Sequence, residues 1–113
     1  MIDMNKQVYL DIVKTIIGFL YIKDYEGVLN DDYAENLTSQ EIETALTEYG
    51  GEVTIPPEDS YNKMSIYKVR DRDEVSIDFN LWIDNVESDL TLTVRIINVN
   101  GVPKYTIEGI HVL

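Results

Sequence analysis

The spacing of apolar residues changes from three and four residues in the first half of the chain to two residues in the second half. The first spacing is typical of helices with one buried face, and it predicts helices over residues 5–22, 24–30 and 39–49. The second is typical of half-buried strands, and it predicts strands over about residues 61–70, 74–84, 89–99 and 103–112. A loop through residues 85–87 is expected between the middle two strands. Helices followed by strands predict a single α+β domain over residues 1–113.

Short polar motifs mark several of the expected element ends. Thr38-Ser39-Gln40-Glu41 has the form of a capping box, in which a hydroxyl and a carboxylate each accept a hydrogen bond from an amide. Asp24 is a candidate N-cap, and Gly50-Gly51 can adopt the positive backbone angles that end a helix. Asn100-Gly101 is a hairpin turn signal. The apolar phase of the last strand shifts across Gly109, which predicts a β-bulge.

The expected sheet has one apolar face, which has to be covered by other elements. The front helices are the available cover, so we expect N-terminal helices packed on a curved, mainly antiparallel sheet of about four strands. A long first helix inside a curved sheet resembles the cystatin-like or nuclear-transport-factor-2-like cone. This resemblance concerns fold alone, because that cone occurs in enzymes, binding modules and immunity proteins.

Acidic residues dominate the charge of the chain. There are 21 aspartates and glutamates against 9 lysines and arginines, which gives a formal net charge of −12. Such a field repels nucleic acids and anionic membrane surfaces and favours basic protein partners. The alternative is that the charge only keeps the protein soluble. The chain has no cysteine, which fits a reducing, cytoplasmic location. Charged and polar residues interrupt the apolar run at 7–22, so that run predicts a buried helix rather than a membrane span.

No complete catalytic or metal-binding motif is present in the sequence, so we expect no catalytic residues, no metal site and no cofactor. His111 is the single histidine, and a strand-edge packing role is the favoured reading over general-base catalysis. Acidic pairs such as Asp31-Asp32 are interpreted as solvated turns. The segment 84–89 is the nearest approach to a calcium loop but lacks its spacing and central glycine. The sequence therefore favours a non-catalytic protein.

Trp82 falls on the polar phase of its expected strand and is the centre of the predicted binding site. Aromatic residues are enriched at binding hot spots, and acidic neighbours suit a basic partner. The alternative is that a loop or helix covers Trp82. The predicted binding residues are Asp78, Asn80, Trp82, Asp84, Glu87, Asp89 and Glu108.

Two segments resemble a family of small bacterial proteins with no assigned biochemical function. The first runs from Leu81 to Leu92, with Leu-Trp at its start and Ser-Asp-Leu-Thr-Leu at its end, and the second is the terminal Ile110-His111-Val112-Leu113. The front half is similar at Asp24-Tyr25-Glu26 and at Glu48-Tyr49-Gly50. The turn at 84–87 departs from the family because it has no glycine. The resemblance implies an α+β domain and, loosely, an immunity role in a toxin–immunity system.

Two functional hypotheses and one alternative assembly follow. The leading hypothesis is a non-catalytic acidic protein-binding module, in the form of an immunity-type protein that neutralises a basic toxin domain. The alternative is a cone-fold enzyme or small-molecule-binding protein with a pocket between the first helix and the sheet, lined by Tyr9, Tyr67, Tyr105 and His111. A homodimer through the open sheet face is a further alternative.

Overall fold

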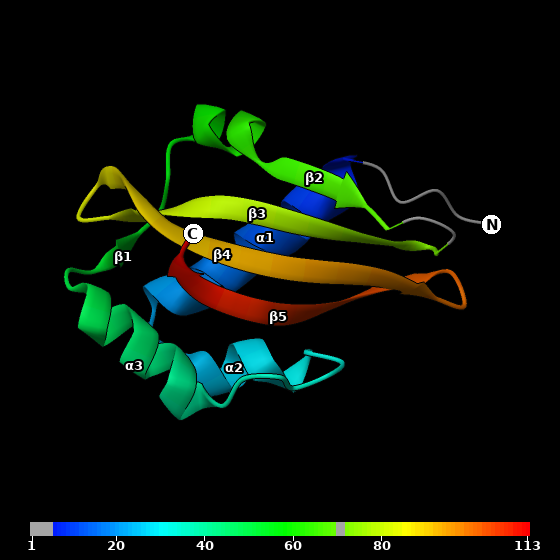
Figure 1. The fold of residues 1–113 in the computed structure, drawn as a ribbon, viewed down its shortest axis with the longest axis horizontal. Coiled ribbons are helices and arrows are strands. Elements are labelled where there is room, and N and C mark those ends of the chain that lie inside the picture. The colour runs from blue at the N-terminus through cyan, green and yellow to red at the C-terminus, as the bar shows by residue number, and fades with distance from the viewer. Residues whose placement is uncertain (1–5, 70–71) are drawn as a thin grey trace.

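Helices occupy the first half of the chain and strands the second half in this computed structural model, which describes residues 6–69 and 72–113 (Figure 1). In chain order the elements are α1 (Lys6–Tyr21), α2 (Tyr25–Asn30), α3 (Ser39–Tyr49), β1 (Val53–Thr54), the 3-10 helix η1 (Glu58–Lys63), β2 (Ser65–Lys68), β3 (Glu74–Ile83), β4 (Val86–Val99) and β5 (Val102–Val112). The predicted α+β class is confirmed. Residues 5 and 70, at the ends of two expected elements, lie outside the described part of the chain.

The sheet contains five antiparallel strands rather than about four. Its order is β1-β3-β4-β5, and β2 pairs with β3 along the same edge as β1. The capping box at Thr38 and the N-cap at Asp24 are both present as expected. Asn100-Gly101 forms the expected two-residue hairpin turn, since Val99 pairs directly with Val102. The expected bulge in β5 is also present, because the register with β4 shifts next to Gly109.

The expected strand over 61–70 is wrong in its first part. Residues up to Lys63 belong to η1, and β2 covers only Ser65–Lys68. Pro57 is the N-cap residue of η1, and its carbonyl accepts hydrogen bonds from both the amide and the hydroxyl of Ser60. A 3-10 helix of six residues is too short to show a period in its apolar residues, so the sequence pattern does not distinguish it from a strand.

The expected loop at 85–87 is also wrong. Asp84 and Asn85 form a two-residue turn with φ angles of 51° and 66°, and β4 already begins at Val86. The ladder between β3 and β4 then shifts its register between Asn80 and Trp82. The first part of β4 lies at this irregularity and lacks alternating apolar residues, so the sequence pattern there is typical of a loop.

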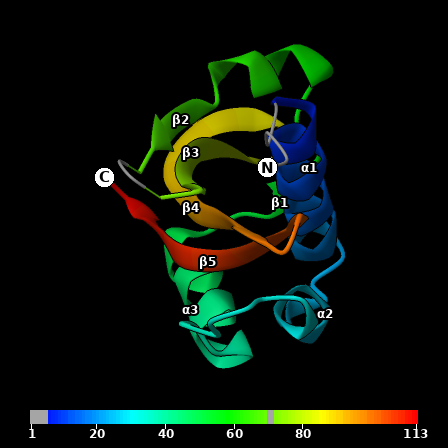
Figure 2. The ribbon, with the colours of Figure 1, turned by 90° about the vertical axis from the view of Figure 1, so that its right-hand side faces the viewer.

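The apolar core lies between α1 and the concave face of the sheet. Figure 2 shows the sheet curving around α1, while α2 and α3 lie beyond β5. Ile16, Ile17 and Leu20 of α1 are almost completely buried against the alternating inward residues of β3, β4 and β5. Tyr61 of η1 extends this core, because its ring stacks on Phe79 with 5.2 Å between centroids. No described helix is long and apolar enough to cross a membrane.

The loop after α2 covers part of the outer edge of β5. Asp32 is 6% exposed and makes a parallel bridge with Tyr105. Its carboxylate accepts hydrogen bonds from the Ile107 amide at 2.9 Å and from the Thr106 hydroxyl at 2.5 Å. The Tyr33 amide donates to the Tyr105 carbonyl at 2.9 Å. These bonds satisfy edge groups that would otherwise be free to pair with another chain.

Candidate functional site

The convex face of the sheet, which points away from α1, carries three of the predicted binding residues. Asp78 accepts a hydrogen bond from the Thr93 hydroxyl at 2.8 Å. Asn80 accepts one from the Thr91 hydroxyl at 3.0 Å. Glu108 is paired through both carboxylate oxygens with Arg95 of β4, each at 3.2 Å. These side chains form an ordered polar surface on the sheet.

Trp82 follows Asn80 on β3 across the irregularity in the β3–β4 ladder, and both side chains line one small cavity, whereas Asp78 and Glu108 do not. Trp82 is half-buried and shares this cavity of about 20 Å³ with Ser60 and Lys63 of η1. Glu87 lies at the same cavity and pairs with Lys63 at 3.0 Å, which lowers the pKa of the Glu87 carboxyl. The cavity is about the size that one water molecule needs, so it is too small for a ligand. η1 therefore lies beside Trp82, as in the alternative in which a loop or helix covers this residue.

The last two predicted residues hold connections between elements. Asp84 accepts a hydrogen bond from the Glu52 amide at 3.0 Å, and its own amide donates to the Glu52 carbonyl at 2.8 Å. Asp89 accepts from the Tyr49 hydroxyl at 2.6 Å, which ties the end of α3 to β4 and raises the pKa of Tyr49. The seven predicted residues are thus distributed over the convex face, the β3–β4 hairpin and the part of β4 that contacts the end of α3.

A groove of about 490 Å³ lies between α3 and the C-terminal part of β5, and we call it the acidic groove. It is lined by Leu37, Gln40, Glu41, Thr44, Ala45, Glu48, Glu108, Gly109, Ile110 and His111. Leu37, Ala45 and Ile110 form an apolar floor and are half-buried or buried. Three glutamates stand around it, and the lining contains no lysine or arginine. The arrangement combines an apolar contact surface with negative charge.

Helix periodicity and the bulge in β5 bring the lining residues together. Glu41, Ala45 and Glu48 lie on one face of α3 because they are spaced by three and four residues. The adjacent face of α3 carries Ile42 and Leu46, which are buried. On β5, Thr93 pairs with Gly109 and Val94 with Ile107, so Glu108 is the extra residue of the bulge.

Gly109 leaves room for the imidazole of His111 in the acidic groove. A Cβ atom added at Gly109 would lie 2.7 Å from Nδ1 of His111, which is closer than real Cβ contacts. No carboxylate among the described residues is hydrogen-bonded to His111. General-base catalysis by a histidine ordinarily depends on such an orienting partner.

Three glutamates of the acidic groove differ in their partners. Glu41 accepts the capping-box hydrogen bond from the Thr38 amide at 3.0 Å. Glu108 is held by Arg95, whereas Glu48 has no cationic partner in the described part of the chain. Glu48 is therefore the carboxylate most available to a cation from outside.

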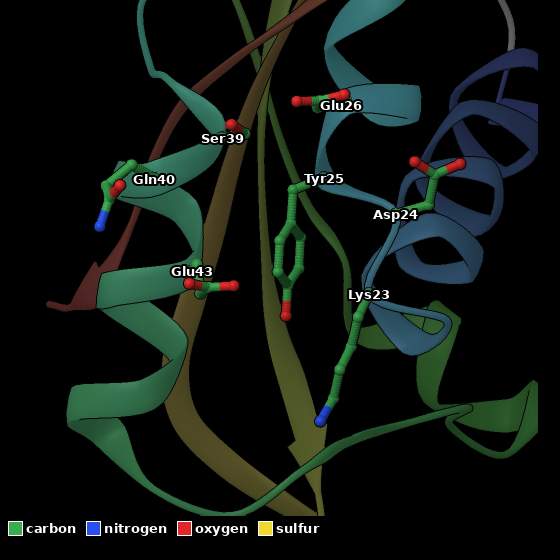
Figure 3. Close-up of a pocket in the computed structure, with 7 residues that line it drawn as sticks. All are labelled: Lys23, Asp24, Tyr25, Glu26, Ser39, Gln40 and Glu43. Atoms are coloured by element: carbon green, nitrogen blue, oxygen red, sulfur yellow. The ribbon is translucent and has the colours of Figure 1, made fainter.

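A second cavity, of about 320 Å³, lies where the α1–α2 junction meets α3 (Figure 3). All its lining residues carry polar groups: Lys23, Asp24, Tyr25, Glu26, Ser39, Gln40 and Glu43. Lys23 pairs with Glu52 at 2.9 Å, and this contact raises the pKa of Lys23. Figure 3 shows the Tyr25 ring between α2 and α3. The cavity lacks an apolar floor, so a ligand bound there would bury little apolar surface away from water.

The four residues of the expected α1–sheet pocket do not come together. Tyr9 is buried in the core, and the Tyr105 hydroxyl donates to the Val28 carbonyl at 2.5 Å. Tyr67 is 56% exposed at the outer strand β2, while His111 lies in the acidic groove. Among the described residues no group of three or more histidine, aspartate or glutamate side chains could hold a metal ion.

Fold and surface together define an acidic α+β domain with a curved sheet, a core filled by α1 and an acidic groove beside β5. The chain belongs to the family described as a domain of unknown function, DUF7668, which matches residues 18–113. No curated protein and no solved structure matches the chain. The family carries no assigned activity, as the resemblance implied, and adds no substrate, partner or catalytic residue.

Proposed function

We propose that this chain is a non-catalytic protein-binding module that recognises a basic surface on a partner protein. The observation that carries the proposal is the acidic groove, where three glutamates and no lysine or arginine surround an apolar floor. The net charge of −12 supports it, because the whole chain then attracts a cationic partner. An immunity-type protein that masks a basic toxin domain is the form of this function that we favour.

The two properties of the groove contribute to different parts of binding. The negative field raises the rate of encounter with a cationic partner, and that rate falls as salt screens it. The apolar floor provides contact area from which water is excluded on binding, and such central contacts carry most of the affinity in protein interfaces. The proposed module therefore binds with a salt-dependent association rate and a less salt-dependent dissociation rate.

Affinity capture from the native host tests the proposal. We expect the tagged chain to retain a protein with a basic surface, and we expect the association rate to fall about tenfold or more between low and high salt. If that partner is a toxin, co-expression of the chain should restore growth of the cells that carry it. Failure to retain a basic partner, or binding that salt leaves unchanged, contradicts the proposal.

Variants of the other predicted residues show how far the binding surface extends. Trp82→Ala removes the aromatic side chain of the β3–β4 hairpin, and the double variant Asp78→Asn/Asp84→Asn neutralises one carboxylate of the convex face and one of the hairpin turn. We expect each to weaken capture if the interface reaches beyond the acidic groove. Unchanged capture by both limits the interface to the groove side of the sheet.

A further inference from the structure

We propose that the occupant of the acidic groove is a helical segment of the partner, with basic residues two turns apart and an apolar residue between them. This inference rests on the proposed function and names the chemistry of its partner. The basic residues of such a segment would lie at positions i and i+7, and the apolar residue at i+3 or i+4, all on one helix face.

The spacing of the α3 glutamates carries the choice of a helix. Glu41 and Glu48 are seven residues apart on α3, which places them about 10 Å apart along the helix axis. A second helix laid along α3 repeats this distance between residues i and i+7 of one face. In an extended segment, residues on one side are separated by about 7 or 13 Å, so neither spacing matches both glutamates.

The floor of the groove lies between the two glutamates and fits the apolar residue. Ala45 is four residues from Glu41 and three from Glu48, and Leu37 and Ile110 lie beside it in the lining. The small side chain of Ala45 leaves the hollow that an incoming apolar side chain would fill. The volume of about 490 Å³ falls within the range of ligand-binding sites, about 300–1,000 Å³.

The third glutamate lies on the opposite wall of the groove. Glu108 belongs to β5 and is already paired with Arg95, so it contributes less free charge than Glu48. The strongest charge contact is therefore expected at Glu48, which is exposed and has no cationic partner among the described residues. Glu48 is therefore the glutamate to replace in the test.

A matched pair of variants on α3 separates the groove from the overall charge of the chain. Glu48→Lys and Glu43→Lys change the net charge equally and lie on the same helix, but Glu43 is absent from the groove lining. Both residues are exposed, and lysine is as good a helix former as glutamate, so both variants should keep the stability of the natural chain. Urea unfolding checks that they do.

The probe is a synthetic helical peptide with lysines at i and i+7, leucine at i+3 and i+4, and alanine and glutamine elsewhere. Control peptides have the same composition in scrambled order, or glutamate in place of lysine. We titrate each into the isotope-labelled chain and follow the amide signals by NMR. We expect the signals of Ala45, Gly109 and Ile110 to shift with the designed peptide only. Glu48→Lys should weaken its binding about tenfold or more, and Glu43→Lys less than about threefold.

The possible outcomes test the groove as a binding site and the proposed function separately. Shifts that are absent, that map to the convex face, or that weaken equally in both variants overturn the groove as the site of a helical segment. A captured partner held equally well by Glu48→Lys and Glu43→Lys does the same while leaving the binding module intact. Absence of any salt-sensitive basic partner in the host overturns the proposed function itself, whatever the peptide does.

Discussion

Replacement of the buried Asp32 should destabilise this fold more than replacement of a solvent-exposed carboxylate in a loop, although the sequence places Asp32 in a polar turn. Four donors converge on its carboxylate: the amides of Ala34 at 3.0 Å and Glu35 at 2.8 Å, the Thr106 hydroxyl and the Ile107 amide. The change to test is Asp32→Ala, with Asp32→Asn as the graded variant.

The expected magnitude depends on which of these donors can reach water afterwards. Ala34 and Glu35 are exposed, so their amides can bond to solvent once the carboxylate is removed. Thr106 is 1% exposed and Ile107 is 0% exposed, so their donors stay buried without a partner. Each such donor costs about 1–3 kcal/mol. With the contribution of the lost charged bonds, we expect Asp32→Ala to reduce the free energy of unfolding by about 3–5 kcal/mol.

Asp32→Asn should reduce the free energy of unfolding less than Asp32→Ala does. Its amide oxygen can still accept from three of the donors, while its NH₂ group faces the Ile107 amide and leaves that one donor unsatisfied. We expect a loss of about 1–3 kcal/mol. The neighbouring Asp31 is exposed and serves as the matched control, for which Asp31→Ala should change stability by less than about 0.5 kcal/mol.

Urea unfolding followed by Trp82 fluorescence and circular dichroism measures all three variants. Hydrogen exchange adds a local reading, because the Ile107 amide should lose protection in Asp32→Ala more than amides of β3 do. If Asp32→Ala is no less stable than Asp31→Ala, the buried carboxylate does not hold the edge of β5 and the reasoning fails.

Two further predictions concern Tyr105 and the start of α3. Burial, with the negative charges of Asp31 and Asp32, raises the pKa of Tyr105 to about 12, against about 10 in an unfolded chain. The stability that its neutral hydroxyl provides is fully present below pH 10 and is lost between pH 10 and 12, by about 2–3 kcal/mol. Urea midpoints measured from pH 8 to 11 should fall less steeply in Tyr105→Phe, and an equal fall would contradict this assignment. Thr38→Ala removes the capping box and should cost about 1 kcal/mol, whereas Thr44→Ala in the same helix should cost nothing. Equal thermal unfolding of these two variants would show that the cap contributes no stability.

Features that depend on neighbours in the chain were predictable from the sequence. The capping box needs only Thr38 and Glu41 three residues apart, and the Asn100-Gly101 turn needs only residues that tolerate positive φ angles. The bulge at Gly109 was visible because an extra residue shifts the alternation of apolar positions. In each case the physical cause lies within a few residues.

Features that depend on distant contacts were not predictable in this way. The sequence pattern indicates a solvated turn at Asp32, yet its carboxylate accepts a hydrogen bond from the Ile107 amide, which is 75 residues away. The sequence left open whether a loop or helix covers Trp82, but it did not identify η1 as that element and did not predict the irregular ladder next to Asn80. The polar phase of a strand shows which side chains share a face, but it carries no information on what covers that face.

The sequence by itself determined the class of the fold, its order of helices and strands, most helix and turn ends, and the acidic character of the chain, because periodicity, local hydrogen bonding and composition act along the chain. The tertiary structure alone decided that α3 lies beside the end of β5, and so brought Glu41 and Glu48 to the same groove as Glu108 and Ile110. That juxtaposition depends on how helices of a given length pack around a curved sheet. Packing of this kind is a sum of many weak contacts between distant segments, and no single stretch of sequence contains it.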